Sequence, residues 1–194
     1  MSSEPSISGS AQPLSARPES VGVSSSDPAT LLQRFQSYRL LWILATTVFV
    51  LDQATKIWIS ARMPIGTYGL PGAITVIDGF FYLVHVGNTG AAWSMFTGRS
   101  PLLAMLALVT LGAIFFWRKA LSLRIRVVQV GFGLLCGGIV GNLVDRLIHK
   151  HVIDFLDFHF GSYIYPTFNV ADSGICVGVG IYLLWSLKNP DVSR

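Results

Sequence analysis

Four long apolar stretches constrain this chain more than any other feature of its sequence. They run over about residues 38–60, 101–117, 127–148 and 170–187. A helix that spans the hydrocarbon core of a bilayer needs about 17–25 predominantly apolar residues, and each stretch meets that requirement. Only 12% of the residues are charged. Soluble domains carry about a quarter, so much of this surface must face lipid. The sequence therefore predicts an all-α membrane fold with four transmembrane helices.

The rest of the chain divides into a tail and the connections of one membrane domain. Residues 1–30 are rich in Ser and Pro, and they lack the apolar surface needed to offset the entropy of ordering. We expect a disordered cytoplasmic tail and no signal peptide, because the first apolar run begins only near Leu40. Residues 31–190 then form the four-helix transmembrane domain. Within the connection 61–96, the β-branched and aromatic residues 74–86 predict strands of a small extracytoplasmic β-sheet.

Basic residues predict the orientation, because cytoplasmic loops of membrane proteins carry an excess of Lys and Arg. Nine of the 14 Lys and Arg residues lie before residue 40, in the segment 118–126 or after the last stretch, and five lie on the other side. We therefore expect a multi-pass protein with both termini in the cytoplasm. The connections 61–100 and 149–169 are then extracytoplasmic.

Polar residues on three of the stretches fall at a similar predicted depth. Counted at about 1.5 Å per residue from the cytoplasmic ends, Asp52 lies ~20 Å, Asp145 ~28 Å and Asp172 ~24 Å into the membrane. Charged groups at such depth are costly and usually functional, so their convergence near the outer leaflet predicts a site. Small-xxx-small spacing in the third and fourth stretches also predicts that these two helices touch. The glycines concerned are Gly133, Gly137, Gly141, Gly174 and Gly178.

Four local patterns hold most of the polar residues that suggest chemistry. They are DQATK (Asp52–Lys56), NTGAAW (Asn88–Trp93), GGIVGNLVDR (Gly137–Arg146) followed by VIDF (Val152–Phe155), and FNVAD (Phe168–Asp172). In this order they resemble the lipoprotein signal peptidase (signal peptidase II) family over roughly residues 38–187. The resemblance implies an aspartyl intramembrane peptidase of the bacterial cytoplasmic (inner) membrane, with its active site on the extracytoplasmic side. The family removes the signal peptide of prolipoproteins, cleaving before a diacylglyceryl-modified cysteine.

The resemblance also implies which residues act. Asp154 in VIDF and Asp172 in FNVAD match the two aspartates of the family's catalytic dyad. Two neighbouring carboxylates cannot both ionise cheaply, so such a pair shares one proton and can activate a water molecule. Nine further residues match substrate-binding or supporting positions: Asp52, Lys56, Asn88, Gly90, Asn142, Asp145, Arg146, Asn169 and Ala171.

Some expectations for these residues come from local spacing. Asp52 and Lys56 lie four residues apart on one helical face and can form an ion pair. An ion pair between Asp145 and Arg146 is expected to hold the end of the third helix. The chain departs from the family pattern at Lys150, where glycine is common, and at Trp93, where phenylalanine is usual. These departures bear on substrate preference and leave the reaction class unchanged.

The resemblance implies diacylglyceryl-modified prolipoproteins and membrane lipid as partners, and no cofactor or metal. We expect a monomer, and no nucleic-acid partner, because the basic residues form no continuous stripe with aromatic residues. Which prolipoproteins are processed, what the tail does and which aspartate carries the shared proton all stay open. In a coupled pair the protons belong to both groups together.

Three alternatives compete with the peptidase interpretation. The segment 149–160 (HKHVIDFLDFHF) contains potential metal ligands but none of the spacings typical of a metal motif, and Asp157 is expected to face water. The ligand types are His149, His151, Asp154, Asp157 and His159. A transporter would place polar groups near the midplane between repeated halves, and the sequence shows no such repeat. A structural membrane scaffold would not need aspartates at matched depth.

Overall fold

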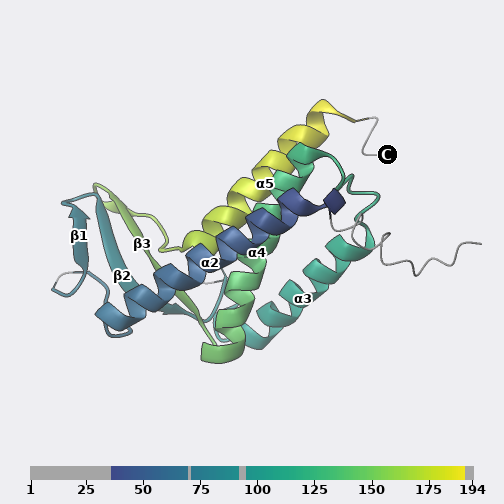
Figure 1. Ribbon diagram of the computed structural model, residues 1–194. Helices are drawn as coiled ribbons and strands as arrows, with labels where there is room; N and C mark the ends of the chain where they lie inside the picture. Colours follow the sequence, from purple (N-terminus) through teal and green to yellow (C-terminus); the bar gives the residue numbers. More distant parts are fainter. Residues whose placement is uncertain (1–35, 70, 92–94, 191–194) are drawn as a thin grey trace, which may run out of the picture.

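The computed structural model describes residues 36–69, 71–91 and 95–190. The predicted tail 1–30 and Trp93 lie outside this part of the chain. Within it, four helices form a bundle: α2 (Arg39–Arg62), α3 (Ser100–Phe116), α4 (Arg126–His149) and α5 (Val170–Lys188). Figure 1 shows the bundle with a small sheet at one end, and the two ends of the described chain at the other.

Three of the four helices are long and apolar enough to cross a membrane. They are α2 and α4, with 24 residues each, and α5, with 19 residues. At about 1.5 Å per residue, 19 residues extend ~28 Å and 24 residues ~36 Å, which matches a hydrocarbon core of about 30 Å. Helix α3 is apolar but shorter, with 17 residues. The predicted arrangement of helices with a small sheet is thus confirmed, and three of the four described helices are apolar enough to span a membrane.

Glycines let the backbones of α4 and its neighbours come close together. The predicted contact between the third and fourth stretches is present, because a Cβ atom at Gly178 would meet Leu135 N at 2.8 Å and one at Gly174 would meet Leu134 O at 3.1 Å. A stripe of glycines at intervals of four on α4 lies mainly on a different interface. It packs on α2, against residues that include Leu41, Leu44, Ala45 and Val48; the stripe consists of Gly133, Gly137 and Gly141.

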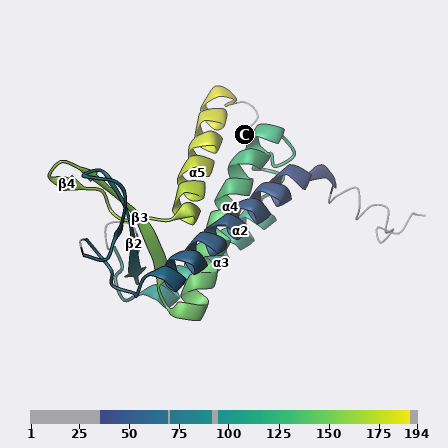
Figure 2. The same ribbon diagram turned by 60° about the vertical axis from the view of Figure 1, so that its left-hand side comes forward.

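The sheet is antiparallel, with its strands in the order β1 (Ile74–Ile77), β2 (Phe81–Asn88), β3 (Val152–Phe160) and β4 (Tyr163–Ile164). The strands predicted within residues 74–86 are confirmed as β1 and β2. Strand β3 was not predicted, although its residues VIDFLDFHF are the β-branched and aromatic types that favour strands. Figure 2 shows β2 and β3 running side by side from the end of the bundle.

The change from α4 to β3 occurs at Lys150. Its backbone lies in the left-handed region, with φ 65° and ψ 5°, and it is the C-terminal cap of α4. A side chain with a Cβ atom is disfavoured in this conformation, which glycine adopts readily. This explains physically why a glycine suits this position in the family pattern. The turn directs the chain from the helix straight into β3.

An apolar cluster fixes β3 to the bundle. Ile59 and Met63 at the end of α2 pack against Ile153 and Phe155 of β3, and all four are buried. Burying such a side chain contributes about 1.5–3 kcal/mol relative to leaving it exposed. Ile153 and Phe155 directly flank Asp154 in the strand. The packing that holds these two side chains therefore also fixes the position of the Asp154 carboxylate.

Candidate active site

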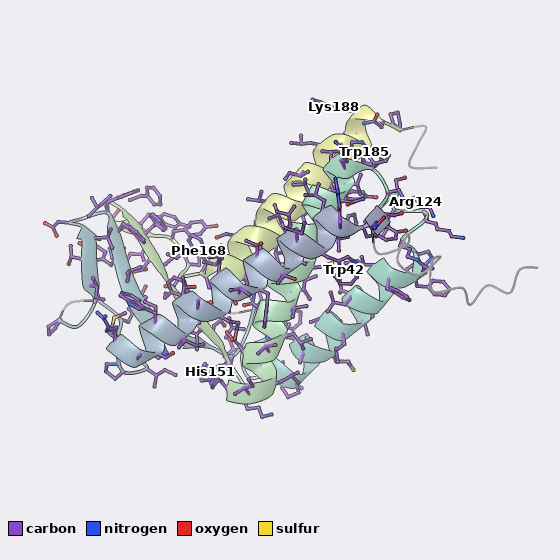
Figure 3. The ribbon with its side chains drawn as sticks, in the orientation of Figure 1. Trp42, Arg124, His151, Phe168, Trp185 and Lys188 are labelled. Atoms are coloured by element: carbon purple, nitrogen blue, oxygen red, sulfur yellow. The ribbon has the colours of Figure 1, made fainter. Side chains whose placement is uncertain are left out.

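The polar residues predicted at matched depth lie together where the bundle meets the sheet. Figure 3 shows the side chains of this region, with Phe168 between β3 and the start of α5 and His151 at the lower end of α4. The residues come from elements far apart in sequence. Helix α2 contributes Asp52 and Lys56, α4 contributes Asn142 and Asp145, and α5 contributes Asp172.

Asp172 is held at the first turn of α5 by a reciprocal cap with Asn169. Asn169 Oδ1 accepts a hydrogen bond from Asp172 N at 2.9 Å, and Asp172 Oδ2 accepts one from Asn169 N at 3.3 Å. Asparagine at the cap and a carboxylate in the first turn are both favoured there, because they satisfy free N–H groups and oppose the helix dipole. Asn142 Nδ2 donates a third hydrogen bond, to Asp172 Oδ1 at 2.7 Å.

Asp154 is buried in β3 and is held by two asparagines. Asn88 Nδ2 donates to its Oδ2 at 2.9 Å, and Asn169 Nδ2 donates to its Oδ1 at 2.7 Å. Burial raises the pKa of Asp154 to about 7, and the negative charge of Asp172 contributes to the rise. Near neutral pH this carboxyl group therefore exchanges readily between its protonated and ionised forms.

Asn169 connects the two aspartates. Its side chain touches Asp154 Oδ1 through nitrogen and the backbone of Asp172 through oxygen. Its Nδ2 also approaches Asn142 Oδ1 at 3.2 Å, and Asn142 in turn donates to Asp172. Asn142 and Asn169 thus link the two carboxyl groups within one hydrogen-bond network.

A buried ion-pair network lies directly behind the two aspartates. Lys56 Nζ lies 2.8 Å from Asp52 Oδ2 and 2.8 Å from Asp145 Oδ2, so the predicted pair of Asp52 with Lys56 is confirmed. Lys56 also donates to Asn142 Oδ1 at 3.1 Å, which fixes the orientation of that amide. The prediction that Asp145 pairs with Arg146 was wrong. Neighbours in a helix point in different directions, and Asp145 turns toward Lys56 on α2 instead.

Arg146 faces the opposite side, toward the segment after β2. Its Nη2 donates to Gly90 O at 3.1 Å and its Nη1 to Asn142 O at 3.3 Å. Its Nε is buried and has no hydrogen-bond partner within the described residues. Glycine is required at position 90 for another reason, because a Cβ atom there would meet Met95 O at 2.6 Å. Its N–H donates to Asn88 Oδ1 at 2.8 Å, so Gly90 also orients Asn88.

Asp157 differs from the sequence prediction. Asp157 was expected to face water, but it is buried, and its Oδ2 lies 2.8 Å from His159 Nε2. Asp157 and His159 lie on the strand face opposite Asp154, and the rings of His149 and His151 lie 5.9 Å apart at a tilt of 37°. In the described part of the chain, no three His, Cys, Asp or Glu side chains gather as metal ligands.

Sequence reasoning missed Gln53. Its Nε2 donates to Asp52 Oδ2 at 3.2 Å and to Asp145 Oδ1 at 3.1 Å. The signal was its place beside Asp52 in the DQATK pattern. Consecutive residues of a helix point in different directions, so the sequence alone does not place Gln53 with Asp52. The crossing of α2 over α4 brings its side chain into the network.

Solved structures define the class of protein to which this fold belongs. A bacterial membrane enzyme solved at 2.3 Å resolution matches with a TM-score of 0.69 and 30% sequence identity, over 78% of this chain and 90% of that chain. A second, solved at 1.9 Å resolution, matches with a TM-score of 0.64 and 30% identity, over 76% and 92% of the two chains. The fold is that of a membrane-embedded enzyme.

Sequence comparison identifies the family. The family model described as signal peptidase (SPase) II matches residues 44–188, so the chain belongs to the signal peptidase II family. It is 39% identical to a lipoprotein signal peptidase of Maridesulfovibrio salexigens, over 78% of this chain and 97% of that protein. It is 45% identical to one from Oleidesulfovibrio alaskensis, over 72% and 88% of the two chains. The protein is therefore a membrane protease.

Proposed function

We propose that Asp154 and Asp172 form the catalytic dyad with which this protease removes the signal peptide from prolipoproteins. The observation that carries the assignment is Asn169, which contacts Asp154 and caps the helix turn that holds Asp172. The names of the relatives, lipoprotein signal peptidases, support the substrate class. The family resemblance supports the finer proposal that cleavage falls just before a diacylglyceryl-modified cysteine.

The surroundings of the two carboxyl groups support a division of labour. Burial and the negative charge of Asp172 raise the pKa of Asp154 to about 7, so this carboxyl group can hold a proton near neutral pH. Asp172 lies at a helix N-terminus, where two N–H donors to its carboxylate and the helix dipole stabilise its negative charge. Ionised Asp172 takes a proton from a water molecule as that water attacks the scissile carbonyl carbon, and Asp154 donates its proton to the carbonyl oxygen.

The intermediate then collapses by the reverse transfers. Asp172 gives its proton to the leaving nitrogen, the C–N bond breaks, and a proton from the new hydroxyl returns to Asp154. The products are a signal peptide with a free carboxyl end and a protein that begins with the modified cysteine. The dyad returns to its starting state with one shared proton, so a single water molecule is consumed.

Arg146 is proposed to bind the substrate backbone next to the dyad. Its Nε has no acceptor within the described residues, and a buried donor without a partner is costly. A substrate carbonyl oxygen would satisfy it. The guanidinium is meanwhile fixed by Gly90 O and Asn142 O, so binding requires little further ordering. Asn88 and Gly90 would form the neighbouring wall of the substrate site.

The membrane arrangement is proposed from the distribution of residues along the bundle. Helix α3 would be the fourth span, since its 17 residues extend ~25 Å and most of its large apolar side chains are exposed. Figure 3 shows Trp42, Trp185, Arg124 and Lys188 toward the end away from the sheet. Aromatic and basic residues suit a cytoplasmic boundary, so both termini would be cytoplasmic and the site extracytoplasmic.

Two variants test the dyad on a diacylglyceryl-modified precursor in detergent or nanodiscs. Asp154→Asn and Asp172→Asn should each abolish cleavage, while Asp78→Asn in the exposed turn after β1 should cleave at the normal rate. Size-exclusion profiles and thermal denaturation establish that all three variants fold. Cleavage that persists in either dyad variant would overturn the assignment. Loss of cleavage on addition of a chelator would favour the metal alternative.

A further inference from the structure

Gln53 joins the two carboxylates that lie behind the dyad. Its Nε2 lies 3.2 Å from Asp52 Oδ2 and 3.1 Å from Asp145 Oδ1. It also approaches Gly141 O at 3.3 Å, where α2 crosses α4. A side-chain amide has two N–H groups, so it can serve two of these acceptors at once. Gln53 thus bridges α2 and α4 with neutral donors, beside the charged bridge made by Lys56.

Each of these carboxylates also holds the backbone of a segment that carries one dyad aspartate. Asp52 Oδ1 accepts a hydrogen bond from Ala171 N at 2.9 Å, and Ala171 directly precedes Asp172. Asp145 Oδ2 accepts one from Ile153 N at 3.1 Å, and Ile153 directly precedes Asp154. The two contacts are equivalent. Both use the N–H group one residue before the aspartate, and both are fully buried.

The distance between the two aspartates therefore depends on the distance between Asp52 and Asp145. Lys56 fixes one oxygen of each through its ammonium group. That contact constrains distance but little orientation, because an ammonium on a flexible stem acts as a point charge. Gln53 approaches Asp145 at Oδ1, the oxygen opposite the one held by Lys56 and Ile153. It prevents the Asp145 carboxylate from rotating about its side-chain bond.

We propose that Gln53 is a positioning residue for the hydrolysis, acting through Asp52 and Asp145 to set the separation of Asp154 and Asp172. The inference rests on the proposed function of the dyad. Gln53 itself does not touch the two aspartates within the described contacts, so its effect should fall on the chemical step. Substrate binding, which involves Arg146 and the segment after β2, should be little affected.

Two substitutions distinguish positioning from simple filling of space. Gln53→Met keeps the length and volume of the side chain and removes both donors. We expect kcat to fall about 10- to 100-fold with KM changed less than about threefold, as for a misplacement of catalytic groups by about 1 Å. Gln53→Glu restores one donor only when its carboxyl group is protonated. Its activity should therefore be highest at acid pH and fall more steeply than that of the parent protein as pH rises.

The control variant is Thr47→Val on α2, whose hydroxyl bonds only to Ile43 O of its own helix and lies on the exposed side. It should retain the parent kcat and pH profile. A Gln53→Met variant with parent kcat would overturn the inference, as would a Gln53→Glu variant with the parent pH profile. Failure of the dyad proposal is separate, because it would appear as cleavage by Asp154→Asn or Asp172→Asn. If Gln53→Met does not fold, the pH profile of Gln53→Glu decides.

Discussion

Asn169 donates its side-chain N–H to Asp154 Oδ1 at 2.7 Å, although the two residues belong to different elements. The same side chain begins α5 by accepting a hydrogen bond from Asp172 N. One asparagine thus provides a helix cap and a contact to the carboxyl group on the neighbouring strand. The position of the first turn of α5 relative to β3 is thereby fixed by the residue that touches the reacting groups.

The two tasks of Asn169 can be separated by substitution. Asn169→Ser retains an oxygen that can cap α5 but cannot reach Asp154, and Asn169→Ala loses both contacts. Both variants should lose activity at least about 100-fold, because the amide also orders Asn142. The alanine variant should in addition be less stable than the serine variant by about 1 kcal/mol, the usual effect of losing a cap. Cleavage assays and chemical denaturation measure the two effects; equal stability would contradict the capping role.

Asn88 tests the other contact to Asp154. Asn88→Ala removes the donor to Oδ2 and leaves the Asn169 contact in place. Asp154 becomes negatively charged as it gives its proton to the carbonyl oxygen, and a hydrogen bond to a charged group contributes about 1.5–3 kcal/mol, so kcat should fall about 10- to 100-fold. Thr89→Ala is a suitable control, because the Thr89 hydroxyl bonds to Gly98 N in an exposed loop. If the two variants have the same kcat, Asn88 does not support the dyad.

The raised pKa of Asp154 predicts the pH dependence of activity. Its value of about 7, against an ordinary value of 3.8, means that the carboxyl group keeps its proton up to neutral pH. The mechanism needs one proton on the dyad, so kcat should decline as pH rises above about 7. A kcat profile measured from pH 5 to pH 9 checks this. Constant activity to pH 9 would contradict the assignment of Asp154 as the proton donor.

The same pKa predicts how stability changes with pH. Between about pH 4 and pH 7 the folded protein holds a proton on Asp154 that the unfolded chain has released. The free energy of unfolding should therefore fall as pH rises through this window and level off above it. Thermal denaturation at pH 5 and pH 8 measures the change. Asp154→Asn should show a smaller difference between the two values, and an unchanged difference would indicate another group.

The sequence predicted the helices and the convergence of polar groups well, for clear physical reasons. Apolar stretches of spanning length become helices because lipid leaves no other way to satisfy the backbone. The polar positions on α2, α4 and α5 meet because helices of similar length share one membrane depth. Strands β1 and β2 followed from β-branched and aromatic residues. The helices and the first two strands follow from residue composition and segment length, which can be read from a single sequence.

Features that depend on how elements cross were not predictable in this way. The glycine stripe on α4 faces α2, and only the rotation of α4 in the bundle decides this. The partner of Asp145 is Lys56, 89 positions earlier, while its neighbour Arg146 points elsewhere. Strand β3 was read as a connection, because two aspartates interrupt its apolar pattern. In the structure Asp154 is buried beneath Asn88 and Asn169, which bond to it. Asp157 is buried on the other face of the strand, where it pairs with His159.

Lys150 offers a prediction about stability. Its left-handed conformation disfavours any side chain with a Cβ atom, and its Nζ compensates only by donating to Leu147 O at 3.0 Å. Lys150→Gly should therefore stabilise the fold by about 1 kcal/mol, the usual size of such conformational strain. Cleavage should continue at the parent rate, because Lys150 makes no contact with the dyad among the described residues. A lower melting temperature for the glycine variant would show that the Leu147 contact outweighs the strain.

Two glycines of α5 provide a final, paired prediction about helix packing. A Cβ atom at Gly178 would collide with Gly131 O and lie 2.8 Å from Leu135 N, whereas one at Gly180 would have nothing within 4 Å. Gly178→Ala should force α5 away from α4 and destabilise the protein by about 1–3 kcal/mol, as overpacking does. Activity should fall as well, because the same displacement moves Asp172. Gly180→Ala should be neutral or stabilising by up to about 1 kcal/mol, since alanine favours the helix. Thermal denaturation and cleavage rates of the two variants, measured in the same detergent, test this prediction. Equal melting temperatures and equal cleavage rates for the two variants would mean that α4 and α5 are not in close backbone contact.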